Sequence, residues 1–220
     1  MFGLVRKLNR LRGFAGAGCV ALLLAGCASG ASNQRGMVQV KLPFPSELSL
    51  CPNMRVSNAP AADGYRKIDP YRKLVALSKR VVVATAPVEA GCLSSGVGMR
   101  SGRLHKGYDI FHPVPVNIYA AGEGKILEVS YRNDYGNMVL IDHRDGFFTR
   151  YAHLETINPD IKVGQKVAIG HPLGLMGNSG DGSLARHLHV EYLHGNYNTR
   201  KMSFGLKPLD IYNLQSLPAF

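Results

Sequence analysis

Between residues 118 and 192 the apolar positions form short runs that glycines interrupt, and no helix-length period of apolar residues runs through the stretch. Short runs bounded by glycine turns are typical of strands rather than helices. The runs are AAGEGKILEV, YGNMVLID, DGFFTRYAHL and VGQKVAIGHPLGLM. The pattern therefore predicts mainly antiparallel β-structure, in which one face of a sheet stays open as a groove.

A different pattern precedes this stretch. Asp69 has the chemistry of a helix N-cap, and Pro70 suits the first turn of a helix. The residues that follow present a partly apolar face, which we interpret as a face that packs on the core. We therefore expect a short helix from Pro70 to about Arg80 in an N-terminal extension, and the first strand at 81–84.

The first 26 residues have the organisation of an export signal. Four basic residues precede an apolar run, Gly13–Gly26, that is too short to span a membrane as a stable helix. The run leads into LAGC at residues 24–27, which resembles the bacterial lipobox, where the peptide is cut before a cysteine that then receives lipid. The alternative is an ordinary secretory signal with a chance cysteine. Ala28 and Ser29 resemble the residues of lipoproteins sorted to the outer membrane.

Charge and cysteine usage change with export. The full chain has a net charge of +11, and removal of the four basic residues of the signal leaves +7. A basic exported protein can bind nucleic acid, anionic lipid or an anionic cell wall. The sequence contains no recognisable nucleic-acid motif, so nucleic acid is not an expected partner. The alternative is a basic surface that is only solvated.

Two cysteines remain after Cys19 in the signal and Cys27 at the lipid site are set aside. In an oxidising compartment Cys51 and Cys92 most simply form one disulfide, which closes a loop of about 40 residues and contributes roughly 2–4 kcal/mol. Two buried free thiols are the alternative. Neither cysteine stands in a motif typical of a thiol nucleophile.

Histidines near a single aspartate carry the candidate chemistry. His187 and His189 share one face of a strand-like segment, because side chains alternate with period two. His105 and Asp109 are four residues apart around a glycine that argues against a helix. Two histidines and one carboxylate leave one tetrahedral position of zinc for water, as catalytic sites do. His153 adds a candidate for proton transfer.

The alternative for these residues is chance clustering. The chain has eight histidines, and spacing alone does not show that any of them meet in space. The remaining histidines are expected to be surface or hydrogen-bonded residues; they are His112, His143, His171 and His194.

Six motifs in order along residues 96–194 resemble the lysostaphin-type zinc metallopeptidases, also called LytM domains. They are HKGYDI, YAAGEG, YGNMVLIDH, TRYAHL, IKVGQKVAIGHPLGLMGNSG and HLHVEY. The resemblance implies the lysostaphin-like sheet fold with its open groove. Together with the export signal, it divides the chain into a lipoprotein signal (1–26), a lipidated tether and extension (27–79), and the peptidase domain (80–220, core 96–194).

The resemblance implies roles for individual residues. One zinc ion would be bound by His105, Asp109 and His189, and His153 and His187 would be the catalytic histidines. Arg100 would bind substrate at the groove, and a solvated loop arginine is its alternative.

The implied function is a zinc-dependent endopeptidase that hydrolyses peptide cross-links of peptidoglycan. Because the signal indicates a bacterium with an outer membrane, a DD-endopeptidase anchored by lipid at the periplasmic face of that membrane is expected. The alternatives are a catalytically inactive LytM-like activator of a wall amidase and a structural envelope lipoprotein.

Overall fold

The computed structural model describes residues 41–180, 185–198 and 205–214, and these residues contain strands and no α-helix. The strands are β1 (Leu74–Ala76), β2 (Val82–Ala84), β3 (Cys92–Ser95), β4 (Gly98–Arg100), β5 (Arg103–His105), β6 (Tyr108–Phe111), β7 (Asn117–Tyr119), β8 (Gly124–Arg132), β9 (Gly136–Asp142), β10 (Phe147–Ile157), β11 (Lys166–Val167), β12 (Pro172–Met176), β13 (His187–His194) and β14 (Lys207–Pro208). The prediction of a mainly antiparallel β-fold is confirmed.

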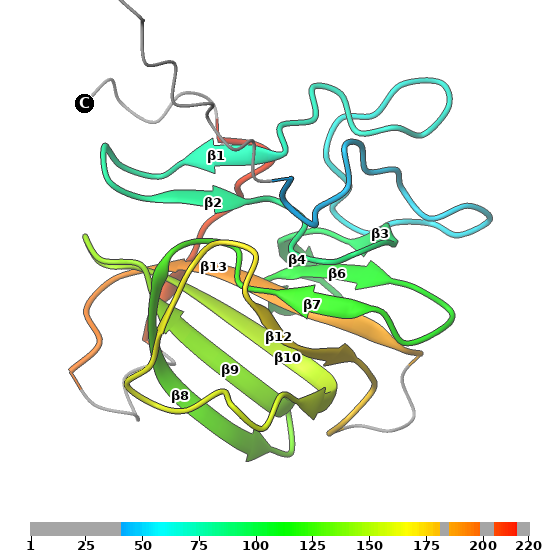
Figure 1. Cartoon of the computed structure of the whole chain (residues 1–220). Helices are drawn as coiled ribbons and strands as arrows, with labels where there is room; N and C mark the ends of the chain where they lie inside the picture. The colour runs from blue at the N-terminus through cyan, green and yellow to red at the C-terminus, as the bar shows by residue number, and fades with distance from the viewer. Residues whose placement is uncertain (1–40, 181–184, 199–204, 215–220) are drawn as a thin grey trace, which may run out of the picture. The chain divides into compact units, whose positions relative to one another are not determined.

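Ten of these strands form one sheet, whose central path runs β11-β8-β9-β10-β13-β6-β3 (Figure 1). β12 pairs with β10 and β7, and β14 pairs with β13. Every neighbouring pair of named strands is antiparallel. β1 with β2 and β4 with β5 form two separate hairpins.

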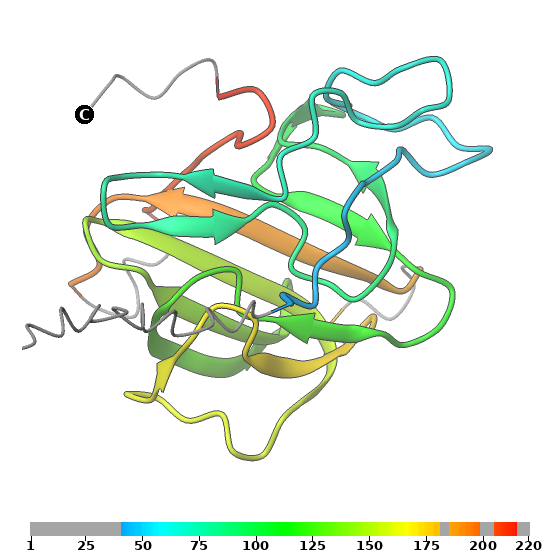
Figure 2. The same cartoon turned by 45° about the horizontal axis from the view of Figure 1, so that its top comes forward.

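Strand β13 shows how the sequence pattern builds the two faces of this sheet. Leu188, Val190 and Tyr192 alternate along it and are fully buried in the main core. The β1–β2 hairpin lies over β13 (Figure 2). It packs on this apolar side, where the hydroxyl of Tyr192 donates a hydrogen bond to the carbonyl of Ala84 (2.5 Å). The alternate residues of β13 therefore face the opposite side of the sheet.

The helix predicted from Pro70 to Arg80 is wrong. The chain forms the β1–β2 hairpin there, with Leu74 opposite Ala84 and Ala76 opposite Val82. The run of β-branched valines at 81–83 favours strand, and pairing with it takes the preceding segment into the hairpin. Tertiary pairing thus overrides the local N-cap signal at Asp69.

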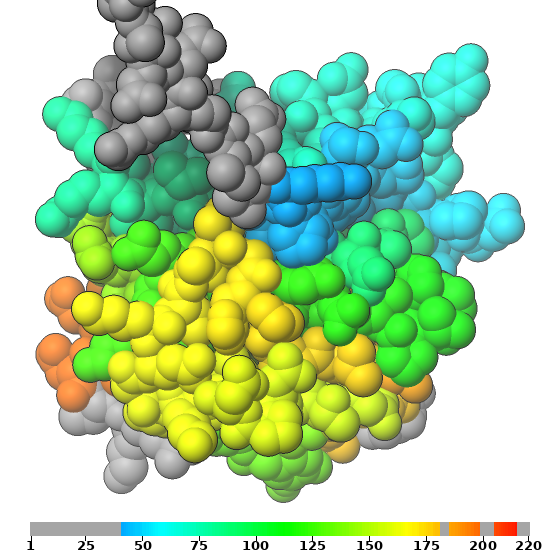
Figure 3. Space-filling view, in the orientation of Figure 1, coloured from blue at the N-terminus to red at the C-terminus, as the bar shows by residue number. Residues whose placement is uncertain are grey.

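The described residues belong to one compact unit, so the extension from residue 41 packs within the same unit as the strands. Phe44 and Leu48 are buried in the main core, and the ring of Phe44 lies edge-on to that of Tyr119. Figure 3 shows this first segment, in blue, against the yellow surface around residue 170, where Pro43 approaches Gly170. The domain boundary at residue 80 stays a prediction.

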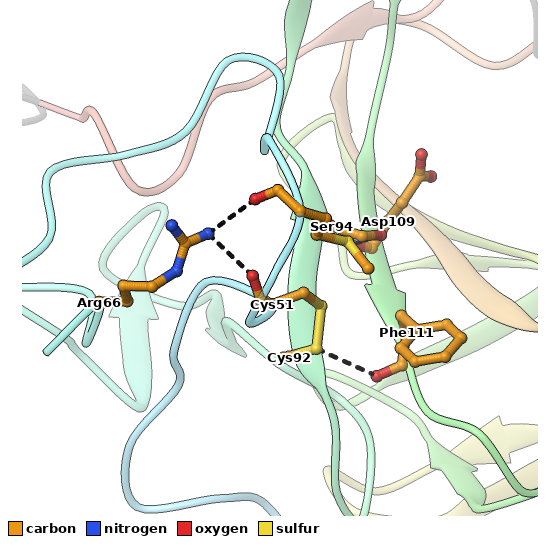
Figure 4. The surroundings of a disulfide bond; sticks show 7 residues. Cys51, Arg66, Cys92, Ser94, Asp109 and Phe111 are labelled. Atoms are coloured by element: carbon orange, nitrogen blue, oxygen red, sulfur yellow. Dashed lines mark hydrogen bonds between the residues drawn. A yellow bond between two sulfur atoms is a disulfide. The ribbon is translucent and has the colours of Figure 1, made fainter.

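A disulfide between Cys51 and Cys92 ties the extension to β3 (Figure 4). Cys92 pairs with Phe111 of β6, the strand that also contains Asp109. The carboxylate of Asp109 points away from the disulfide in this view. The bond therefore lies behind the strand that presents the aspartate, not in the candidate site.

The predicted signal (1–26) and the lipidation site, Cys27, lie outside the described residues. No helix among the described residues is long and apolar enough to cross a membrane.

Candidate metal centre and active site

Three predicted metal ligands meet on the groove side of the main sheet. Asp109 in β6 lies directly opposite His189 in β13, and His105 ends β5 beside them. His189 Nδ1 is 2.8 Å from Asp109 Oδ1, His105 Nε2 is 3.1 Å from the same oxygen, and the two nitrogens are 3.2 Å apart. All three side chains are buried.

These donor atoms fit a single zinc ion. Zinc binds imidazole nitrogen at about 2.0–2.1 Å, so two neighbouring ligands of a tetrahedral ion lie about 3.3 Å apart. The three observed separations are close to this value. No fourth His, Cys, Asp or Glu of the described residues joins the cluster, which leaves one tetrahedral position for water.

In His105 and His189, the ring nitrogen that does not face the cluster has a hydrogen-bond partner, and this contact orients the imidazole. His105 Nδ1 donates to the carbonyl of Gly96 (2.8 Å), which leaves Nε2 for the cluster. His189 Nε2 is 3.3 Å from Glu191 Oε1, which leaves Nδ1. Such partners fix ring orientation and make the ligating nitrogen more basic.

The ionisation of the cluster also suits a cation. Although burial opposes it, the close contacts with His105 and His189 hold the pKa of Asp109 well below its usual range. Burial likewise disfavours charge on His189, but its bonds to Asp109 and Glu191 raise the pKa of this histidine to about 9. A metal ion would take the place of the His189 proton, because an imidazole ligand must be deprotonated.

His153 and His187 lie side by side next to the cluster, with ring centroids 4.7 Å apart. His153 Nδ1 donates to the carbonyl of Ser179 and His187 Nδ1 to that of Ala185, each at 2.8 Å. In both rings Nε2 therefore bears the free lone pair, and His187 Nε2 lies 3.8 Å from Asp109 Oδ1.

A bulge in β10 turns His153 toward the groove. The register between β10 and β9 shifts between Tyr151 and Leu154, and His153 has a φ of 60°. Positive φ is uncommon for a residue other than glycine, and bulges often re-aim a side chain next to an active site. The backbone N–H of His153 donates to the carbonyl of Tyr135 (2.8 Å), which holds this conformation.

Burial favours the neutral form of both of these histidines. Burial lowers the pKa of His153 to about 4, and burial also lowers the pKa of His187. A neutral imidazole whose Nε2 is free can accept a proton, as a general base does.

A layer of buried polar groups behind His189 was not predicted from the sequence. Glu191 is completely buried and accepts hydrogen bonds from Tyr135 (2.7 Å) and from the buried guanidinium of Arg150. Although burial opposes it, the contacts with His189, Arg150 and Tyr135 lower the pKa of Glu191 to about 2. The sequence contained one indication that Glu191 lies near the site. His187, His189 and Glu191 alternate with period two, which puts all three on one face of β13.

The cluster lies in an open groove of ≈ 910 Å³. Arg100, Arg103 and Lys106 line it together with the five predicted residues of the site. Arg100 Nη1 donates to Ser95 Oγ (3.1 Å) and lies 3.3 Å from Asp109 Oδ2. The arginine predicted to bind substrate is therefore at the groove and half exposed.

The other predicted residues lie outside the groove. Its lining residues include neither Cys51 nor Cys92. The same holds for the four histidines expected to be surface or hydrogen-bonded residues, which are His112, His143, His171 and His194.

Comparison with known families bears on these residues. Residues 103–201, which include every proposed ligand and catalytic histidine, match the profile of peptidase family M23. The chain carries a peptidase family M23 domain. The match confirms the resemblance that the ordered motifs indicate.

Two curated relatives resemble this M23 domain. Peptidoglycan DD-endopeptidase ShyC of Vibrio cholerae is 36% identical over 91 residues, which are 41% of this chain and 20% of ShyC. Lipoprotein YgeR of Escherichia coli (strain K12) is 36% identical over 89 residues, which are 40% of this chain and 35% of YgeR. The chain thus spans a fifth to about a third of the length of these relatives.

A solved structure is also similar to the domain. A zinc-containing peptidase from Vibrio cholerae aligns with 32% identity and a TM-score of 0.47, over 57% of this chain and 37% of that chain.

Proposed function

We propose that this protein is a zinc-dependent endopeptidase that hydrolyses peptide cross-links of bacterial peptidoglycan, as a DD-endopeptidase. The observation that carries the proposal is the triangle of His105, Asp109 and His189 donors beside the paired imidazoles of His153 and His187 in an open groove. A peptidase needs an activated water and a proton carrier in one place, and this arrangement can supply both.

In this proposal His105, Asp109 and His189 hold the zinc ion, which supplies a Lewis acid and brings the pKa of water toward neutrality. His153 and His187 lie side by side next to this cluster, and each has Nδ1 on a backbone carbonyl, which leaves a lone pair on Nε2. One of them accepts the proton of the attacking water and thereby becomes a donor. It then passes that proton to the leaving amine nitrogen, while the other imidazole orients the reacting groups.

The predicted signal and one relative support our proposal for the location. The lipobox-like sequence ending at Cys27 indicates a lipid anchor, and YgeR is named a lipoprotein. We place the protein at the periplasmic face of the outer membrane, where a net charge of +7 after signal removal favours an anionic wall.

Digestion of isolated peptidoglycan tests the proposal. Purified mature protein, loaded with zinc, is incubated with wall material, and the fragments are identified by mass analysis. Loss of cross-linked peptide fragments in favour of monomeric ones is expected, and His189→Ala serves as the inactive control.

Two results would contradict the proposal. Unchanged cross-links with zinc-loaded protein would favour an inactive activator, which a parallel digestion with added wall amidase would reveal. Cleavage within the glycan strands would exclude an endopeptidase.

A further inference from the structure

The β4–β5 hairpin places two arginines on the same face as a proposed zinc ligand. Its register pairs Gly98 with His105, Met99 with Leu104, and Arg100 with Arg103. Residues opposite each other share a face, and alternate pairs share it too. Arg100 and Arg103 therefore lie on the His105 face, one alternate position farther along the hairpin.

The facing positive charges of Arg100 and Arg103 repel each other unless an anion lies between them. Cations directly opposite each other on neighbouring strands destabilise the pairing. Lys106 adds a third positive charge to the same lining of the groove. Arg100 is offset by Asp109 at 3.3 Å, but neither Arg103 nor Lys106 forms an ion pair with any residue in the described part of the chain.

The acidic residues that line the groove already have partners. Asp134 pairs with Arg132 at 3.1 Å, and Glu191 pairs with Arg150. Asp109 lies among the donors of the proposed zinc site. The positive charges of Arg103 and Lys106 are therefore not neutralised by the acidic residues of the groove, and a bound zinc ion would add to them.

We propose that Arg103, together with Lys106 and Arg100, binds a free carboxylate on the peptide substrate. The inference rests on the proposed function and names its substrate class, an acidic peptide. The arginine pair lies two residues from His105, or roughly 7 Å along a strand. An extended peptide covers that distance in about two residues, so the recognised carboxylate belongs to a residue within about two positions of the scissile bond.

Binding of two matched peptides tests this inference apart from catalysis. Both are synthetic cross-linked peptides of one sequence, one with a free carboxylate near the cross-link and one with the corresponding carboxamide. The zinc-loaded His153→Ala variant of the mature protein is used, so that neither peptide is cut during calorimetry. The free carboxylate should bind at least about tenfold more tightly, as expected for a hydrogen bond between charged groups.

Substitution of the hairpin arginine locates the effect. Arg103→Gln should remove most of the preference, whereas Arg55→Gln should keep it, since Arg55 is exposed and does not line the groove. A carboxylate held only by zinc would keep its advantage in Arg103→Gln, and that result would overturn the inference.

Turnover with active enzyme separates the two proposals. Amidation should raise KM with little change in kcat, because the contact lies away from the reacting atoms. Equal affinity for both peptides would overturn the carboxylate site and leave the endopeptidase proposal intact. If the two peptides bind unequally but the zinc-loaded protein without substitutions cleaves neither, the carboxylate site is supported and the endopeptidase proposal is contradicted.

Discussion

Among the described residues, buried or partly buried histidines lie in the groove and at the end of β9, and the partner of the second ring nitrogen distinguishes these two regions. In the groove, His153 and His187 each use Nδ1 on a backbone carbonyl, and no hydrogen bond to Nε2 is present among the described residues. At the end of β9, His143 also uses Nδ1 on a carbonyl, that of Glu123 at 2.7 Å, but its Nε2 is 2.7 Å from Thr149 Oγ1. Low exposure and an Nδ1 hydrogen bond to a carbonyl are therefore common to both regions. A histidine can accept a proton in catalysis only where its Nε2 is not already held by another protein group.

The largest effect is expected from removal of a proposed ligand. His189→Ala should abolish zinc binding and peptidoglycan cleavage, because two remaining donors do not make a catalytic site. Elemental analysis and wall digestion on one preparation measure both. His143→Gln is the matched control from the second region and should retain zinc and activity.

His153→Ala separates ligation from proton transfer within the groove. The variant should retain its zinc, yet cleavage should fall by about 10²–10⁴-fold, the usual contribution of a general acid or base. The measurement is zinc content beside the rate of peptidoglycan digestion. Zinc loss equal to that of His189→Ala would refute the assignment of roles.

Glu191→Gln tests whether the layer behind His189 contributes to the metal site. The amide still accepts a hydrogen bond but has no charge, so zinc affinity should fall by about 10–100-fold. Competition with a chelator measures this affinity. Glu128→Gln is the control, since Glu128 is also buried but does not line the groove. A similar loss of zinc affinity in Glu128→Gln would mean that the Glu191→Gln effect comes only from reduced stability.

The disulfide should matter for stability and not for chemistry. Replacing Cys51 and Cys92 with serine should lower the free energy of unfolding by roughly 2–4 kcal/mol, since a loop of 41 residues is released. Thermal unfolding measures the loss. The folded variant should still bind zinc and cut peptidoglycan; loss of zinc binding in fully folded protein would implicate a thiolate in the site.

The smallest effect concerns the pH dependence of stability at His143. Burial lowers the pKa of this histidine from 6.5, so the unfolded chain binds its proton more readily. The stabilisation is complete above pH 6.5 and is lost as the pH falls below it. Between pH 7.5 and 5.5, wild type should lose up to about 1 kcal/mol more than His143→Gln in denaturant unfolding. Equal slopes for both proteins would contradict this interpretation of His143.

The sequence predicted most of the fold because glycine turns and short apolar runs follow local rules. It failed at the β1–β2 hairpin, where pairing with the valines at 81–83 overrides the cap signal of Asp69. The shared face of His187 and His189 on β13 could be predicted from period-two alternation. Such rules apply within a strand and do not show which strands become neighbours.

The site was accessible from the sequence only in part. Motif order identified the five residues that the structure places at the groove. The bulge that turns His153 inward depends on strand register, and the burial of Glu191 beside Arg150 depends on the pairing of β10 with β13. Neither is local in sequence, so spacing could not reveal them.

Zinc K-edge X-ray absorption on the purified protein tests the central claim most directly. Two imidazole nitrogens and oxygen ligands at about 2.0–2.2 Å are predicted, in a spectrum that His153→Ala leaves unchanged. Sulfur scattering at about 2.3 Å, or a third imidazole that disappears in His153→Ala, would contradict the assignment of His105, Asp109 and His189 as the protein ligands.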